Sequence, residues 1–350
     1  MPPVAKGLTS APSTSGSVGK QAWLLTLPVE FAIIMSSAWD AYTIMEGPIQ
    51  LPGDAPMDYM THSLFGVAAY AAQDKSKLDV KTKIALLATS VGANIIPDID
   101  IQWATKTNDS YLIYHRGITH SFLMAPVWAG LFALLAFLLV RAKGKRFFLT
   151  ALAGVLLHIV SDWTNPWGTG LLEPFTSRRY VSGFIPNKGY VFWCFAAAIA
   201  VLLPFFRMPK QRLRVLRGFW ALSAFYVLFQ LGHASYLYAD LKAQGYEHVA
   251  IRADRWPGGF SYYAKKGGEI VEGRSDLRGR QPSGIVQEYR TDPVDLDPLM
   301  ENPSARALIL FAPFVGTQDL GDSVRLFDPR FAGRRGFLDI VVPKPNPSSN

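Results

Sequence analysis

Blocks of apolar residues between Met57 and Asp240 constrain the fold of this chain most strongly. The clearest block, His120 to Val140, has the length of about 20 residues that a helix needs to cross a bilayer. Further long blocks cover residues 147–160, 190–206 and 218–238, and two shorter ones cover 63–72 and 84–96. The sequence therefore predicts an all-α membrane helical bundle of about six apolar helices, some of them short.

The character of the chain changes after Leu241. Only 18% of all residues are charged, which is low for a soluble protein. The apolar blocks end near residue 240, and short alternating runs such as HVAIRAD, GFSYYAK and GGEIVEG follow, separated by Gly and Pro. Such runs are typical of strands and hairpins. We expect a membrane-embedded helical domain over 57–240 and a small, soluble, β-rich C-terminal domain over 241–350.

Residues 1–56 are expected to form a poorly structured or peripheral extension. The first 20 residues are rich in Ser, Gly, Pro and Thr. The apolar run within Gln21 to Ala38 contains a proline and Glu30, so it suits a poor membrane helix or a signal-peptide core. A third alternative is that translation begins at Met57.

Basic residues mark alternate loops between the apolar blocks. They cluster at 75–83, 141–146 and 207–217, and these loops alternate with the loops at 97–119 and 161–189. Positively charged loops of membrane proteins stay in the cytoplasm. The pattern predicts a multi-pass membrane protein with these three basic loops in the cytoplasm. The net charge of +8 is then a sign of membrane topology, and no nucleic acid is expected as a partner.

Histidines and aspartates gather at the ends of the apolar blocks on the predicted outer side. They lie in the motifs THS, PDID, HRGITHS and HIVSDWTNPWG. The candidate metal ligands are His62, Asp98, Asp100, His115, His120, His158 and Asp162. Ionisable groups are costly beside a membrane unless something binds them, and a metal ion binds His and Asp together.

The spacing of these residues suits one or two metal ions. His158 and Asp162 are four residues apart, so on a helix they share one face. Asp162 could bind the metal or fix the tautomer of a histidine instead. A site of His nitrogens and Asp oxygens suits Zn²⁺ first and Mn²⁺ second. A metal with three protein ligands activates water at neutral pH, which is the chemistry of a hydrolase.

Further polar residues have a possible functional role or a structural one. Arg116 could clamp a phosphate or carboxylate, or lie among lipid head groups. Glu173 is a possible base or further ligand, whereas His233 and His248 are expected to be structural. The single cysteine, Cys194, excludes an internal disulfide. No order of Ser, His and acid suggests serine catalysis.

At these motifs the sequence resembles the YdjM-like family of LexA-binding, inner-membrane-associated metal-dependent hydrolases. The matching elements are MDYMTHSLFG, IPDID, HRGITHS and GVLLHIVSDWTNPWG, which start at residues 57, 96, 115 and 154. Members of that family commonly begin at the equivalent of Met57. The resemblance implies a membrane frame up to about residue 240 and a metal-dependent hydrolase.

This family is distantly similar to zinc-dependent phospholipase C and the P1-type nucleases. That likeness implies that His158 and Asp162 are ligands from one helix, and that His115 or His120 with an aspartate of PDID complete one metal. It also implies that His62 serves a second metal through Asp162. The later His series that holds a third zinc in those enzymes is not evident here, so one or two ions are expected.

The sequence as a whole predicts a membrane-bound hydrolase whose site faces outward. A lipid or other phosphoester is the expected substrate, and the lipid bilayer is the expected partner. Asp98 and Asp100 are predicted to orient or deprotonate water, and Arg116 to stabilise developing charge. The alternatives are a transporter or metal-handling protein, and a regulatory scaffold with a structural metal.

Overall fold

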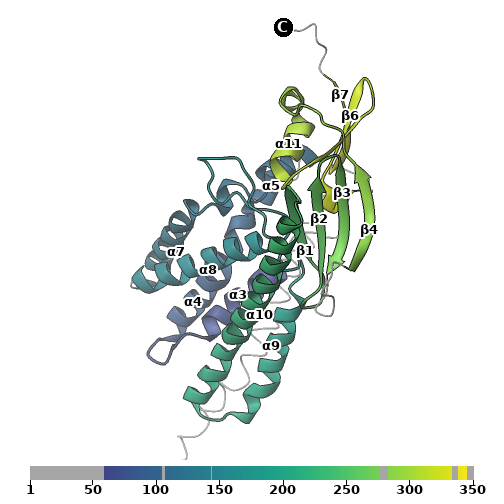
Figure 1. Ribbon diagram of the computed structural model, residues 1–350. Coiled ribbons are helices and arrows are strands. Elements are labelled where there is room, and N and C mark those ends of the chain that lie inside the picture. Colours follow the sequence, from purple (N-terminus) through teal and green to yellow (C-terminus); the bar gives the residue numbers. More distant parts are fainter. Residues whose placement is uncertain (1–58, 105–106, 143, 276–282, 333–337, 345–350) are drawn as a thin grey trace, which may run out of the picture.

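A computed structural model gives the structure of the chain and describes residues 59–104, 107–142, 144–275, 283–332 and 338–344 (Figure 1). The predictions for the extension at 1–56 and for a start at Met57 lie outside these residues. The helical part comes first in the chain, and antiparallel strands with one short helix follow it.

Among the described residues, the helical part has six longer helices with short helical turns between them. The longer helices are α3 (Tyr59–Ala71), α4 (Val80–Ala93), α7 (Met124–Val140), α8 (Gly144–Thr164), α9 (Tyr190–Leu202) and α10 (Pro209–Ala243). The short ones are η2 (Ile96–Asp100), α5 (Ile101–Ala104), α6 (Asn108–Tyr114), η3 (Ile118–His120) and η4 (Leu203–Phe205).

The described residues contain fewer candidate membrane spans than the predicted number of about six apolar helices. Among the described residues, α8 and α10 are long and apolar enough to cross a membrane, and the number rises to four if each of two bent pairs counts as one span. The bent pairs join α4 to the 96–104 segment, at 58°, and residues 108–120 to α7, at 65°. The predicted count of about six apolar helices in the membrane bundle is therefore not confirmed.

The apolar block from His120 to Val140 is not one continuous helix, as the sequence predicted. A turn separates His120 from Met124, where α7 begins. Within this turn the Phe122 backbone N–H donates to the Leu171 carbonyl at 3.0 Å. This bond to a distant loop replaces a helical one, so hydrophobicity alone did not reveal the break.

Apolar side chains on the outer faces of α7 and α10 are exposed. On α10 they include Phe225 and Leu228, and on α7 they include Leu134, Leu138 and Leu139. Exposed apolar patches of this kind mark a surface that another apolar phase covers. They fit helices that face lipid.

Helices α3 and α4 approach closely at Gly66. A Cβ atom there would lie 2.6 Å from Val91 Cα and 2.8 Å from the Ser90 carbonyl oxygen. Both neighbours are backbone atoms, and Ser90 Oγ also donates to the Gly66 carbonyl at 2.8 Å. The glycine therefore sets the helix separation that brings His62 of α3 toward the other motifs.

Substitution of Gly66 by alanine should destabilise the protein by about 1–3 kcal/mol, because the two helices must move apart. The matched control is Gly232→Ala on α10, where no described atom lies within 4 Å of the added Cβ. The control should be neutral or slightly stabilising. Thermal unfolding of both variants in detergent measures the difference, and equal midpoints would contradict the close contact.

The C-terminal part contains two antiparallel sheets. The first has the order β1 (His248–Ala253), β2 (Phe260–Lys266), β3 (Glu269–Ser275) and β4 (Ser283–Arg290), and the second β5 (Gly316–Asp319), β6 (Ser323–Phe327) and β7 (Asp339–Pro343). In the register His248 pairs with Lys265, Phe260 with Ser275, and Ser323 with Pro343. Helix α11 (Pro303–Phe311) and the turns η5 (Pro298–Glu301) and η6 (Pro329–Phe331) connect and cover the strands. The predicted change to a β-rich C-terminal part is confirmed.

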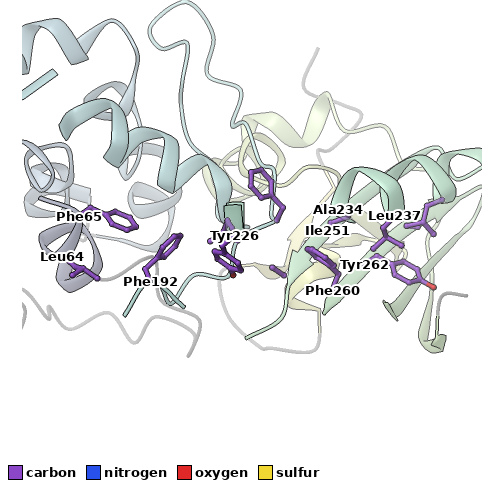
Figure 2. Close-up of a cluster of buried hydrophobic side chains, with 14 of the residues drawn as sticks. Leu64, Phe65, Phe192, Tyr226, Ala234, Leu237, Ile251, Phe260 and Tyr262 are labelled. Atoms are coloured by element: carbon purple, nitrogen blue, oxygen red, sulfur yellow. The ribbon is translucent and has the colours of Figure 1, made fainter. Parts of the chain in front are cut away.

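Two apolar clusters join the strands to the helices. In the first, Leu64, Phe65 and Phe192 pack in a series with Tyr226 and Leu237 of α10, and the series continues to Ile251, Phe260 and Tyr262 of the first sheet (Figure 2). In the second, Tyr111 and Trp167 pack with residues of α11 and β6. The two parts thus share buried surfaces, and the boundary at residue 240 stays a prediction about folding units.

Candidate metal centre

All seven predicted ligands converge in the helical part. His62 comes from α3, His158 and Asp162 from α8, and the remaining four from η2, the end of α6 and η3. His62, Asp100, His120, His158 and Asp162 have no exposed surface, and Asp98 and His115 keep 5% each. Four separate segments of the chain therefore place their imidazoles and carboxylates in one buried region.

Four of these side chains point at a common centre. His120 Nε2 lies 3.0 Å from His158 Nε2, 3.2 Å from Asp98 Oδ1 and 3.3 Å from Asp162 Oδ2. His158 Nε2 lies 3.5 Å from each of the same two carboxylate oxygens. Such a group of four buried side chains could hold a metal ion.

Neighbouring groups determine which ring nitrogens carry lone pairs. His158 Nδ1 lies 2.6 Å from the Asn94 carbonyl oxygen, so this nitrogen donates its proton there. Thr119 Oγ1 donates to Asp100 Oδ2 at 2.6 Å, so it accepts from His120 Nδ1 at 2.9 Å. In both rings Nε2 is then the atom without a proton.

Four lone-pair atoms consequently face one another without a donor. One proton satisfies one of these contacts, whereas a metal ion satisfies all four. Ligand atoms at about 2.0–2.1 Å from a tetrahedral zinc ion are about 3.3–3.4 Å apart. The observed separations of 3.0 to 3.5 Å match that spacing, so the residues present fit a divalent metal.

A second group of candidate ligands shares Asp98 with the first and consists of Asp98, Asp100 and His115. His115 Nδ1 lies 2.8 Å from Asp100 Oδ1. With the proton on Nδ1, His115 Nε2 is a buried lone-pair atom that has no hydrogen-bond partner among the described residues.

His62 lies beside the central group, against His158 and Asp162. Its ring stacks on that of His158, with centroids 3.9 Å apart, and its Nε2 lies 3.3 Å from Asp162 Oδ1. Within the described chain, neither ring nitrogen of His62 forms a hydrogen bond. Asp162 thus presents one oxygen to the central group and the other toward His62.

Arg116 is buried against the same aspartate. Its Nη2 lies 3.0 Å from Asp162 Oδ1, and its Nη1 donates to Asn165 Oδ1 at 2.8 Å. Its backbone N–H donates to Asp100 Oδ2 at 3.0 Å, with φ at 58° in the left-handed region. Only 2% of its surface is exposed, so the alternative in which Arg116 lies among lipid head groups is wrong.

The structure adds residues to the site that the motifs did not single out. Arg179 is buried, lies 3.3 Å from Glu173 and donates to the carbonyl oxygens of Arg116 and Ile113. Burial raises the pKa of Glu173, and Arg179 opposes this shift. Glu173 belongs to neither group of candidate ligands among the described residues. Asn94 contributes its backbone carbonyl oxygen, which lies against His158 Nδ1, and no sequence pattern reveals such a contact.

The two remaining histidines lie elsewhere. The His233 ring packs on Phe260, and the His248 ring packs on Phe314, with centroids 5.0 and 5.6 Å apart. Neither belongs to a candidate metal group in the part of the chain described. This agrees with the structural roles expected for them.

A helical bundle with candidate spans and a buried His and Asp cluster defines a membrane protein that could bind metal. The chain belongs to the YdjM inner membrane protein family, whose family model matches residues 57–236. The predicted membership of a YdjM-like family is therefore confirmed. The matched range contains all seven candidate ligands, the whole of α8 and most of α10, the two described helices that could cross a membrane unbroken.

The uncharacterized protein YfhP of Bacillus subtilis (strain 168) is similar to this chain, with 28% identity over 150 residues. The match covers 41% of this chain and 46% of YfhP, so the chain spans less than half of that relative. No solved structure matches this chain significantly.

Proposed function

We propose that this protein is a membrane-bound, metal-dependent hydrolase that acts on a phosphoester, in particular a lipid or lipid-linked one. The observation that carries the proposal is the convergence of four lone-pair atoms from His120, His158, Asp98 and Asp162 at separations suited to one ion. Family membership supports the membrane setting.

These four side chains would hold the first metal ion, with zinc favoured by the two imidazoles and manganese as the alternative. His115 and Asp100, with the shared Asp98, offer a place for a second ion. When bound, such a metal polarises a phosphoryl oxygen and activates water.

Protein groups around the cluster would orient the reactants. Asp100 accepts from His115, Thr119 and the Arg116 backbone, so it fixes the segment that carries two of the histidines. The Arg116 guanidinium offers positive charge for an anionic phosphoryl group, and its Nε has no hydrogen-bond partner among the described residues. Asp98, which keeps some exposed surface, suits the predicted role of orienting or deprotonating water.

Exposed apolar side chains near the cluster support a substrate from the membrane. They lie on the segments that carry or flank the ligands and include Ile99, Trp103, Ile118, Phe122 and Phe175. The basic loops lie at the other end of α8, about 26 Å away along the helix. This separation supports a site at the outer face, with the basic loops in the cytoplasm.

A regulatory scaffold with a structural metal is the second candidate. The central group supplies four protein ligands and is nearly closed to solvent, which is typical of structural zinc sites. Catalytic sites keep an open position, which the protein would provide by movement near Asp98 and His115. A metal-handling transporter would require ligands along a path, whereas the described clusters lie near one end of α8.

Elemental analysis tests whether the protein binds a metal ion. Protein purified in detergent without chelator should contain at least one equivalent of zinc or manganese, and chelator dialysis followed by the metal should restore it. A preparation that stays metal-free after incubation with either ion would rule out the proposal. Loaded protein should then hydrolyse a phosphodiester, phosphomonoester or phospholipid from a panel. A loaded protein inactive on all of them would favour the scaffold.

A further inference from the structure

A groove lies between α3, α8 and α10, near the end of α8 that is opposite to the metal centre. Its volume is about 720 Å³, and Ala69, Leu149, Ala153 and Trp220 line its walls. Lys145 and Arg146 also line it, in the first turn of α8.

Helix α8 presents a basic and then an apolar series of residues to this groove, and α3 presents a polar and then an apolar residue. On α8, Lys145 and Arg146 are followed one and two turns deeper by Leu149 and Ala153. On α3, Gln73 just beyond the helix end is followed by Ala69. On α10, Trp220 lines the groove, and Arg217, about one turn before it and outside the lining, donates to the Ala72 carbonyl oxygen at 3.1 Å. The groove thus runs from a basic end to an apolar end over about 12 Å.

The C-terminus of α3 accounts for only part of the positive charge. The Lys75 ammonium donates to the carbonyl oxygens of Tyr70, Ala71 and Gln73, which is the usual way a cation satisfies a helix end. Burial, followed by the charge of Arg146, lowers the pKa of Lys75 to about 8.

Lys145 and Arg146 add charge that this helix end does not require. Arg146 donates to the Asp74 carbonyl at 2.7 Å, and no ion pair links it to a described carboxylate. Lys145 has no hydrogen bond or ion pair with any residue that the structure describes. An anion that also carries an apolar chain would complement both the charge and the walls.

We propose that this groove binds an anionic phospholipid, with its phosphate at Lys145 and Arg146 and one acyl chain between α3, α8 and α10. The site is separate from the metal centre, and the inference does not depend on hydrolase activity. Basic pockets between membrane helices on the cytoplasmic side suit such head groups, and the basic loops here are predicted to lie on that side.

Native mass spectrometry of the full chain in detergent tests this site. Titration with phosphatidylglycerol and phosphatidylcholine of identical acyl chains should show tighter binding of phosphatidylglycerol. Lys145→Gln combined with Arg146→Gln should weaken phosphatidylglycerol binding about fivefold for each charge, and it should weaken phosphatidylcholine binding less, because the choline cation offsets the charge of its phosphate. Ala153→Phe should weaken both lipids, because it fills the apolar part.

The matched control removes two charges from the same basic region outside the groove, as Arg212→Gln with Arg214→Gln. Equal binding of the two lipids, or an equal loss in the control, would overturn the proposal. Loss of the Arg146 hydrogen bond could disturb folding, so Lys145→Gln alone serves as a second variant that keeps this bond. The metal content of each variant reports on its fold. A photoreactive acyl chain should label residues 149–153 or Trp220. Labelling of other residues would overturn the proposal. A cross-link between a groove residue and the first 58 residues of the chain would also overturn the proposal.

Discussion

Substitution of His158 by alanine should abolish metal binding while the protein still inserts and folds. His158 Nε2 lies within 3.5 Å of three other candidate ligand atoms, and its Nδ1 is fixed by the Asn94 carbonyl. Loss of one ligand from a four-ligand site should lower the affinity by more than about 100-fold. Elemental analysis of the purified variant and a zinc titration measure this loss.

Two further variants provide comparisons for the loss of metal affinity. Thr119→Val removes the acceptor for His120 Nδ1 and a donor to Asp100 but keeps all ligands, so it should lower the affinity by about 10–100-fold. His248→Ala, at a histidine outside both described candidate metal groups, should keep full metal content. Unchanged metal in the His158 variant would contradict the assigned centre. A variant that fails to fold, while metal-free native protein also unfolds, would favour the structural-metal scaffold.

Substitution of Arg330 by methionine should destabilise the protein by about 3–5 kcal/mol, because it leaves the buried Asp328 carboxylate without its cation. Arg330 Nε donates to Asp328 Oδ1 at 2.9 Å, and neither residue has more than 2% of its surface exposed. The same guanidinium donates to the Pro166 carbonyl oxygen and lies over the Phe311 ring. It therefore joins the C-terminal part to the loop after α8.

The matched variant is Arg325→Met, which removes a more exposed pair. Arg325 lies 2.7 Å from Asp339, but its side chain is 27% exposed. Exposed pairs contribute at most about 1 kcal/mol, so this variant should lose far less stability. Thermal unfolding in detergent compares the two. Equal losses would show that the buried pair does not hold the two parts together.

Much of the helical part was predictable because hydrophobic periodicity and length are local properties. The apolar blocks at 147–160 and 218–238 correspond to α8 and α10, although α10 begins nine residues earlier. The prediction of one continuous helix over 120–140 was wrong, because the turn before α7 depends on a contact with Leu171. No pattern within the block itself reveals that contact.

The candidate ligands were predictable as residue types but not as roles. His158 and Asp162 share a helical face, and their spacing follows directly from helix geometry. In PDID, the 3₁₀ turn η2 directs Asp98 toward His120 and His158, and Asp100 toward His115 and Thr119. From the sequence, Asp98 and Asp100 had the same predicted role, because the difference between their contacts depends on partners 15 to 60 residues away.

The sequence by itself determined most of the helical segments, the change to strands in the C-terminal part, and which side chains could bind a metal, because these follow from local periodicity and residue chemistry. Only the tertiary structure decided that the imidazole protons point outward to Asn94 and Thr119, and that Nε2 lone pairs therefore face the carboxylates. Packing also decided that Arg179 and Arg330 hold the surrounding loops. Burial of charged groups is tolerated only when distant segments supply their partners, and that pairing exists only in the folded chain.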